Sequence, residues 1–387
     1  MKNFVFHNPT KIIFGRDTIP AIGSETAVFG KNALLVYGEG SIKKNGIYDQ
    51  VITSLKKAGV AVVEHGGVKS NPVLSHVHQG IELVKKHGLD VIVAVGGGSV
   101  VDTAKAISAG ALVEHDVWKF FTGKKSVKGA LPLTCVLTLA ASGSEMNSGM
   151  VVTNEETSQK FGFANKHLYP KTSILDPCAT FTVPPHYTAY GAVDAIAHVL
   201  EFYFTNQESY TPVQDHFMEG LVISCMDSCN RTLDNPEDFD ARADLMWAAT
   251  LALNGLTGAG LGKVGFPMHM IEHSLSALYN VAHGAGLSVI IPGWMIYQAQ
   301  KTPEKFARFA ERIFNITSGS TEKKAAEGIQ ALLTWFVKIK TPTSLTALHV
   351  PLQDISKIAR NAVALAKVWN MPDYNEEKIE EILRLCV

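Results

Sequence analysis

Hydrophobic positions in the first half of the chain alternate between short apolar runs and segments with helical spacing. Runs rich in Val, Ile and Leu predict buried strands at residues 33–37, 60–64, 90–95 and 133–138. The segments between them predict helices at residues 46–58 and 73–87, and another that ends near residue 109. This alternation predicts a mostly parallel sheet with helices on both faces. Two runs that flank a polar turn, 150–153 and 160–163, predict a small hairpin.

The pattern changes after Val183-Pro184-Pro185, and helical spacing dominates the remaining chain. Predicted helices cover residues 187–204, 238–253, 267–279, 303–314, 321–338, 350–366 and 375–385. A glycine-rich segment, Gly255–Gly265, predicts a connection between two of them. We therefore expect a Rossmann-like α/β domain in residues 1–185 and an all-helical domain in residues 186–387.

Composition narrows the class of protein. Of the 387 residues, 46% are hydrophobic and only 18% are charged, against about 25% in typical domains, which predicts a large core. The net charge of −1 does not predict binding to nucleic acid or to a membrane surface. The five cysteines form no CxxC pair, the N-terminus does not resemble a signal peptide, and no apolar run approaches about 20 residues. A cytoplasmic protein without a membrane span is expected.

The first candidate for chemistry is the glycine run that ends in Gly97-Gly98-Ser99, where a predicted strand meets a predicted helix. Glycines let backbone N–H groups approach an anion, and a helix N-terminus carries about half a positive charge. A pyrophosphate fits both properties. The alternative is a structural turn, with Ser99 as the helix N-cap and Asp102 in a variant capping box.

The second candidate is a set of acidic and histidine side chains in the helical half. Asp194 and His198 are four residues apart, so they share one helix face. His269 and His273 repeat this spacing, and His283 follows. An Asp and three His could hold one divalent metal, although the spacing alone leaves open which of His269 and His273 is the ligand.

Two competing interpretations apply to these helices. Asp194 and His198 could form an ordinary ion pair, and the order HxxEH at 269–273 leaves an inverted zinc-protease motif as a formal alternative. Glu272 is expected to point elsewhere on its helix.

The combination of these motifs resembles the iron-containing (group III) alcohol dehydrogenases, which have the dehydroquinate synthase-like fold. The butanol dehydrogenase and broad aldehyde reductase branch is the most similar. The resemblance extends over nearly the whole chain. Its clearest motifs besides the GGGS turn are NPTKIIFG at 8–15, YGEGSIKKNG at 37–46, TLAASGSE at 138–145 and the segments 191–198 and 269–284.

The resemblance implies a role for individual residues. The metal ligands would be Asp194, His198, His269 and His283, with Fe²⁺ or Zn²⁺ as the metal, and His273 would be the catalytic group beside the substrate and the nicotinamide. The implied cofactor contacts are Gly97, Gly98, Ser99, Asp102, Thr138, Ser142, Asn147, Gly149 and Lys160. The implied reaction is hydride transfer between NAD(P)H and a primary alcohol or aldehyde, such as butanol or butanal. A homodimer is also implied.

One departure from the branch bears on the choice of nucleotide. The branch commonly has three glycines and a serine after the first strand, whereas this chain has Gly38-Glu39-Gly40-Ser41. A carboxylate there can accept hydrogen bonds from the ribose hydroxyls and repels a 2′-phosphate, so we expect Gly38, Glu39 and Ser41 to contact the cofactor and NADH to be preferred. Lys43 and Lys44 act in the opposite direction, and Glu39 could instead simply face solvent.

Other functions remain possible at this point. A glycerol or polyol dehydrogenase of the same fold, or a lyase of the dehydroquinate synthase type, would share most of these features. A non-catalytic protein that binds a nucleotide and a metal is a further alternative, although the complete ligand set and the intact GGGS turn argue against it.

Overall fold

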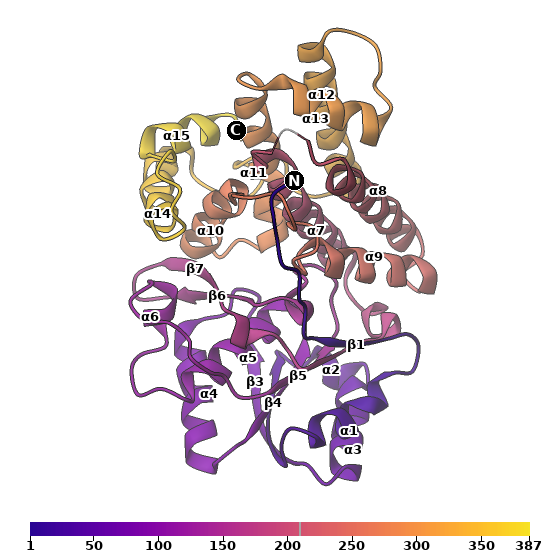
Figure 1. Cartoon of the computed structure of the whole chain (residues 1–387), viewed down its shortest axis with the longest axis vertical. Helices are drawn as coiled ribbons and strands as arrows, with labels where there is room; N and C mark the ends of the chain where they lie inside the picture. The colour runs from indigo at the N-terminus through magenta and orange to yellow at the C-terminus, as the bar shows by residue number, and fades with distance from the viewer. Residues whose placement is uncertain (209) are drawn as a thin grey trace. The chain divides into compact units, whose positions relative to one another are not determined.

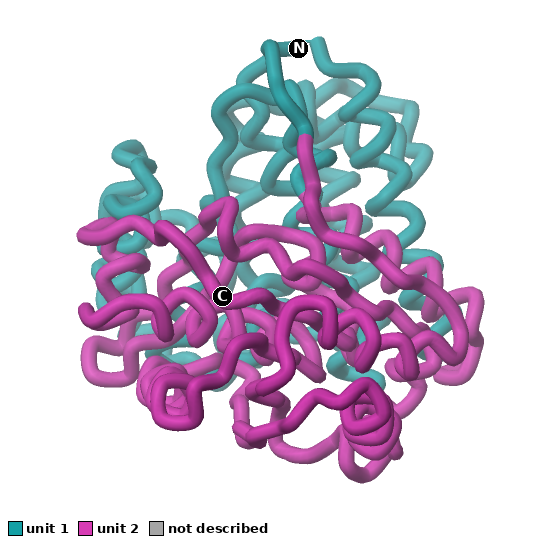
Figure 2. Tube along the Cα trace, turned by 60° about the horizontal axis from the view of Figure 1, so that its bottom comes forward, with its two compact units in different colours: residues 1–6, 184–234, 255–387 teal, residues 7–183, 235–254 magenta. Residues whose placement is uncertain are grey.

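The computed structural model describes residues 1–208 and 210–387. These residues form two compact units (Figures 1 and 2). Unit 2 contains residues 7–183 and 235–254, and unit 1 contains residues 1–6, 184–234 and 255–387. The division after Val183 lies near the boundary expected at residue 185. Two segments depart from a single boundary, because residues 1–6 pack with the helical unit and residues 235–254 pack with the α/β unit.

The described part of unit 2 is built around a six-stranded sheet whose strand pairs are all parallel, so the predicted fold class is confirmed. The strand order is β1-β8-β5-β4-β2-β3. The strands are β1 Lys11–Phe14, β2 Asn32–Gly38, β3 Ala61–Val68, β4 Val91–Gly96, β5 Leu133–Leu137 and β8 Thr172–Leu175. The expected hairpin is also present, as β6 Gly149–Asn154 paired antiparallel with β7 Gln159–Ala164.

The direction in which successive strands are added to the sheet reverses at one point. After β2 the chain runs to β3 on one side, whereas after β4 it runs to β5 on the other side. Since β2 and β4 are neighbours, their carboxyl ends at Gly38 and Gly96 form a topological switch point. Ligands of open α/β sheets bind in the crevice outside such a point.

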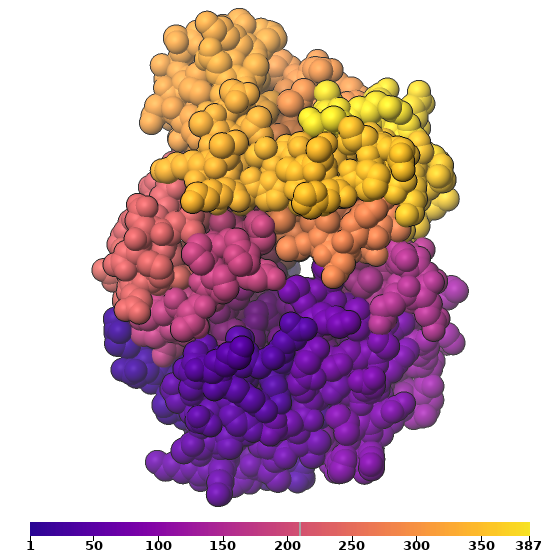
Figure 3. Space-filling view, turned by 180° about the vertical axis from the view of Figure 1, so that it is seen from behind, coloured from indigo at the N-terminus to yellow at the C-terminus, as the bar shows by residue number. Residues whose placement is uncertain are grey.

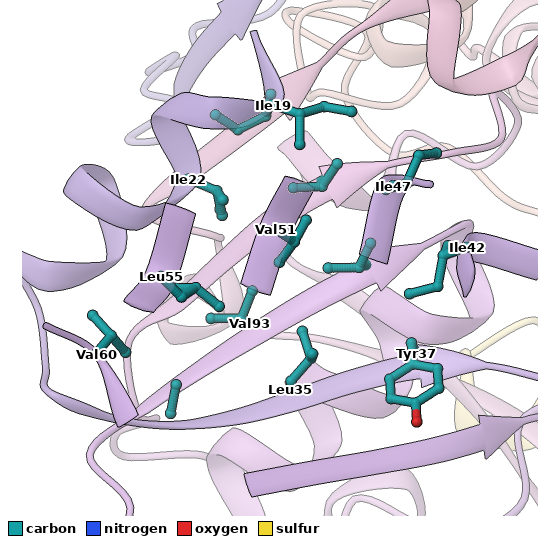
Figure 4. Close-up of a cluster of buried hydrophobic side chains, with 14 of the residues drawn as sticks. Ile19, Ile22, Leu35, Tyr37, Ile42, Ile47, Val51, Leu55, Val60 and Val93 are labelled. Carbon is teal, nitrogen blue, oxygen red and sulfur yellow. The ribbon is translucent and has the colours of Figure 1, made fainter. Parts of the chain in front are cut away.

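Helices cover both faces of the sheet. On one face, Leu35 and Val93 pack against Val51 and Leu55 of α3 in a cluster of buried apolar side chains (Figure 4). The alternate strand residues are buried as well, and α4 and α5 pack on the sheet. Strands buried on both faces read as continuous apolar runs, which is why the sequence predicted β2, β4 and β5. The helices of unit 2 are α1 Ile22–Ala27, α2 Ser41–Lys44, α3 Ile47–Lys57, α4 Leu74–His87, α5 Gly98–Gly110, α6 Trp118–Phe121 and α9 Phe239–Ala252.

Unit 1 is helical in its described residues. Its helices are α7 Pro185–Thr205, α8 Pro212–Asp234, α10 Pro267–Tyr279, α11 His283–Ala299, α12 Pro303–Phe314, α13 Thr321–Lys338, α14 Ile355–Val368 and α15 Glu376–Arg384. Helices α7, α10 and α11 pack against one another and form the buried centre of this unit. The segments that contain α14 and α15 lie at the surface in the view of Figure 3, coloured gold to yellow.

Candidate functional site

Three helices of unit 1 bring the predicted metal ligands together. Asp194 and His198 lie on α7, His269 on α10 and His283 at the start of α11. Three imidazole nitrogens surround the Oδ1 atom of Asp194. His198 Nδ1 lies at 3.5 Å, His269 Nε2 at 3.6 Å and His283 Nε2 at 3.5 Å. The four side chains therefore present one carboxylate oxygen and three imidazole nitrogens to a common point.

The atoms at this point fit a divalent metal. Asp194 Oδ1, His198 Nδ1 and His269 Nε2 are buried, and they make no hydrogen bond within the described residues. A buried polar atom without a partner is costly, so such atoms in one place indicate that a ligand satisfies them. One carboxylate oxygen and three imidazoles are a common ligand set for Zn²⁺ and also suit Fe²⁺.

Burial and the neighbouring charges shift the protonation of these ligands. Burial alone would raise the pKa of Asp194, but the imidazoles of His198 and His283 outweigh it and hold the pKa well below its ordinary value. Burial lowers the pKa of His198 to about 3, so this imidazole is neutral, as metal binding requires. Burial also opposes the charged form of His269, but Asp194 and Glu201 outweigh it and raise its pKa to about 9. An imidazole must be neutral to bind a metal, so a metal at this point would compete with a proton for His269.

Two buried glutamates contact the ring nitrogens of His269 and His283 that face away from Asp194. Glu201 Oε1 lies 3.1 Å from His269 Nδ1 and also accepts a hydrogen bond from the His269 backbone N–H. Glu272 accepts from His283 Nδ1 through one oxygen and from the Ser276 hydroxyl through the other. Carboxylates in this position fix the ring orientation and raise the basicity of a metal-binding imidazole.

The position of Glu272 corrects the expectation that it points elsewhere on its helix. It faces His283 because α11 folds back onto α10 after a short turn. Glu201 was missed by the sequence analysis, although a signal existed. It follows His198 by three positions on α7, so it shares the helix face of the ligands.

Small residues allow the helices to approach closely enough for this geometry. A Cβ atom on Gly284 would lie 2.1 Å from the carbonyl oxygen of Tyr190 in α7. A Cβ atom on Gly286 would lie 2.5 Å from Glu272 Oε1. The glycine after His283 is therefore part of the site, because it lets the start of α11 lie against α7.

His273 lies one helical turn beyond His269 on α10 and has different neighbours. Its ring centroid is 5.5 Å from that of His283 and 5.5 Å from that of Trp369. Potential ligand atoms of Glu272, His273 and His283 lie within 4.8 Å of one another, which leaves His273 beside the ligand set. Phe266 extends this aromatic wall, with ring centroids 5.7 Å from His269 and 6.5 Å from Trp369.

In unit 2, the GGGS turn lies at the switch point of the sheet. Helix α5 begins at Gly98, with Gly97 as its N-cap residue, and within the described chain no side chain caps this end by a hydrogen bond. Ser99 donates instead to the carbonyl oxygen of Ser70, so its predicted alternative role as the N-cap is wrong. A Cβ atom on Gly98 would lie 2.3 Å from Ser142 Oγ, so glycine lets the 142 segment approach the turn.

A buried lysine joins α5 to the segment that follows β5. Lys105 is fully buried, and its ammonium donates to Ser144 Oγ at 2.9 Å, Asn147 O at 2.9 Å and Gly149 O at 2.7 Å. Burial lowers its pKa to about 8. Asp102, one turn earlier, accepts from Ser144 Oγ at 2.6 Å and from the backbone N–H of Val151 at 3.1 Å. Sequence reasoning missed Lys105, because a lysine in a helix is usually exposed.

These contacts also correct the capping-box alternative for Asp102, whose carboxylate binds the 144–151 segment and not the start of its own helix.

The other predicted cofactor residues lie at the same sheet edge or near it. The backbone N–H of Thr138 binds the carbonyl of Gly96, and the Lys160 ammonium donates to Asn71 Oδ1 at 2.9 Å. Glu39 is exposed directly after β2.

None of the described helices is long and apolar enough to cross a bilayer.

A parallel sheet with a glycine turn at its switch point, together with an Asp and three His in a helical unit, is typical of metal-dependent dehydrogenases. Sequence models of one such family match most of the chain. The model of the iron-containing alcohol dehydrogenases matches residues 9–177, and that of the Fe-containing alcohol dehydrogenase C-terminal region matches residues 188–387. The chain belongs to the iron-containing alcohol dehydrogenase family. It is therefore an oxidoreductase of the alcohol dehydrogenase and aldehyde reductase class.

Individual relatives are similar over the full length. The chain is 41% identical to a probable NADH-dependent butanol dehydrogenase of Bacillus subtilis, with 99% of each chain covered. It is 38% identical to an NADPH-dependent aldehyde reductase of Escherichia coli, with 89% of each covered. Among solved structures, the NADH-dependent butanol dehydrogenase A of Thermotoga maritima superimposes with a TM-score of 0.96 at 48% identity. That comparison covers 100% of this chain and 99% of the other.

Proposed function

We propose that the protein interconverts short aliphatic aldehydes and primary alcohols, such as butanal and butanol, with NADH as the preferred nucleotide. One divalent metal, Fe²⁺ or Zn²⁺, would be held by Asp194, His198, His269 and His283. The observation that carries this proposal is the convergence of three imidazole nitrogens on the buried Oδ1 atom of Asp194. The substrate class is supported by relatives that are named butanol dehydrogenases.

The side chains of unit 1 have distinct tasks in this proposal. A bound divalent metal supplies Lewis-acid polarisation of a carbonyl or alcohol oxygen. Glu201 and Glu272 keep the ligand imidazoles in one orientation. His273 orients the substrate oxygen or relays its proton, because it lies beside the ligands without being needed to complete the set of four. Phe266 and Trp369 offer apolar rings to an aliphatic chain.

The nucleotide would be held by unit 2. The Gly97–Ser99 turn at the N-terminus of α5 suits a pyrophosphate. Gly38 ends the neighbouring strand β2, and Glu39 and Ser41 follow it, where the adenosine ribose is expected. We assign further contacts to Thr138, Ser142, Asn147, Gly149 and Lys160. Asp102 contributes by holding the 144–151 segment. The cofactor carries the hydride, and the protein supplies its position.

The proposed cellular setting is the cytoplasm. All five cysteines are free thiols, which is compatible with a reducing compartment such as the cytoplasm. The homodimer implied by the family also stays a prediction.

The proposal is tested by following NADH absorbance with butanal in the metal-loaded protein. We expect NADH oxidation that depends on butanal, and NAD⁺ reduction with butanol in the reverse direction. The matched control is His269→Ala, which removes one proposed ligand and should be inactive. Loaded wild-type protein that binds NADH but turns over no aliphatic aldehyde or alcohol would contradict the proposal.

A further inference from the structure

An ion pair that contacts two tyrosines includes Lys43, which follows the predicted ribose contact Glu39 by four positions. Lys43 of α2 and Glu64 of β3 form a salt bridge, with Nζ 3.1 Å from Oε2. The same carboxylate accepts hydrogen bonds from the Tyr37 hydroxyl at 2.7 Å and from the Tyr48 hydroxyl. Glu64 therefore accepts from three donors, which lie on β2, α2 and α3.

The rings of the two tyrosines also contact the Lys43 ammonium. The Lys43 ammonium lies 4.8 Å from the ring centroid of Tyr37 and 4.5 Å from that of Tyr48. Both distances are within the range of cation–π attraction. Contacts with Tyr37 and Glu64 raise the pKa of Lys43, so its charge persists at any physiological pH. The ammonium is thus directed toward Glu64 even though much of the side chain is exposed.

The position of this cluster connects it to the nucleotide. Tyr37 is the penultimate residue of β2, and Glu39 follows the strand directly. Lys43 lies four positions after Glu39, and Ile42 anchors this short helix in the core (Figure 4). Figure 4 also shows the Tyr37 hydroxyl directed away from the labelled core side chains. Lys43 is the lysine or arginine nearest to Glu39 in the sequence. If its ammonium were free, it could attract a ribose 2′-phosphate bound there.

We propose that Glu64 is a specificity-determining residue that keeps Lys43 unavailable to a 2′-phosphate. In the wild type the pair is neutral overall and the ammonium is already coordinated, so the negative charge of Glu39 is not offset. NADH is then favoured over NADPH. This inference rests on the proposed function, because it concerns the nucleotide that the same site binds.

The test measures the dissociation constants of NADH and NADPH by calorimetry, without turnover, for the wild type and four variants. Glu64→Gln keeps the size of the side chain and can still bond both tyrosine hydroxyls, but it frees the charge of Lys43. We expect the ratio Kd(NADPH)/Kd(NADH) to fall by roughly three- to tenfold, the range for one partly exposed charge acting on a phosphate of about −2. High salt should reduce this gain.

The controls assign the effect to Lys43. Glu64→Gln combined with Lys43→Met should lose the gain, whereas Glu64→Gln combined with Lys44→Met should keep it, because only the neighbouring lysine is changed. Lys43→Met alone should not lower the ratio. NADH affinity of each variant reports that the nucleotide site is intact.

Two results would overturn the inference: an unchanged ratio in Glu64→Gln, or a gain that survives removal of Lys43. Both leave the proposed function intact, since the protein still binds a nucleotide. Failure of the wild type to bind either nucleotide would instead contradict the proposed function, and this inference with it.

Discussion

His269 and His273 lie one turn apart on α10, yet their surroundings predict different roles. His269 faces Asp194 and is supported by Glu201, whereas His273 faces the ring of Trp369. We therefore expect His269→Ala to lose bound metal outright. His273→Ala should keep its metal and lower kcat/KM by about 100-fold or more, as loss of a general acid–base group does. Metal content of both purified variants, measured together with kinetics, checks this prediction.

The two variants control for each other, because both remove an imidazole from the same buried helix. Comparable melting temperatures after metal removal would show that neither substitution disrupts α10 itself. Equal metal loss in the two variants would mean that the roles have been divided wrongly.

Glu39 is exposed after β2, where its charge can act on the adenosine ribose. Replacing Glu39 by glycine removes the repulsion of a 2′-phosphate, so the ratio of kcat/KM values should move toward NADPH by up to about tenfold, or about 1.4 kcal/mol. Glu39→Gln is the matched control, since it removes the charge and keeps the side chain. A ratio unchanged in both variants would place Glu39 in solvent with no part in nucleotide choice.

At the level of residues, spacing and residue type made most of the proposed metal ligands predictable. The i,i+4 pairs place Asp194 with His198 and His269 with His273, but spacing could not choose between the last two. That choice depends on which ring faces α7, a tertiary contact between segments far apart in the chain. Glu272 was misjudged for the same reason, because its partner His283 comes from the next helix.

The helices with a clear amphipathic pattern were all predicted, namely α3, α4, α12, α13, α14 and α15. Helix α10 was predicted at the observed bounds, whereas α11, which begins at His283, was not predicted. Helix α11 is apolar on all sides because it is buried, so it shows no amphipathic stripe, and Pro292 lies within it. Helix α8 was missed too, and it buries polar residues such as Gln214 and Glu219 among its apolar ones. Strands β1 and β8 are only four residues long and carry too little pattern to be recognised.

Lys105 is the residue by which α5 holds the 144–149 segment. Its buried ammonium bonds Ser144, Asn147 and Gly149, and Asp102 shares Ser144 as a partner. Lys105→Met preserves the approximate volume but leaves these buried acceptors without their donor. We expect the free energy of unfolding to fall by about 3 kcal/mol, measured by urea denaturation.

The nucleotide should also bind less tightly to Lys105→Met, because Asn147 and Gly149 lose their support. Lys86→Met is the matched control, since this lysine is exposed on α4 and its loss should change stability by less than about 0.5 kcal/mol. Equal stabilities of the two variants would show that the buried network contributes nothing net.

At the scale of the whole molecule, each unit is assembled from separate stretches of sequence. The helical unit takes residues from both ends of the chain and from the middle, and the α/β unit includes α9 from beyond residue 234. A single boundary near residue 185 describes where the pattern changes, but it does not describe which segments pack together. Packing of α9 depends on contacts such as Thr250 with the buried Glu145, which no local pattern encodes.

The metal should stabilise the helical unit as well as support catalysis, because its proposed ligands come from three helices that the ion would join. A ligand present at about 1,000 times its Kd adds about 4 kcal/mol to the folded state. Removal by a chelator should therefore abolish turnover and lower the Tm by roughly 8 °C or more. Added Fe²⁺ or Zn²⁺ should restore part of both. His269→Ala is the control, since a protein that already lacks the ion should show no change of Tm on chelation. Full turnover in a sample verified to be free of metal would contradict the metal site, and the convergence of three histidines on Asp194 would then need another explanation.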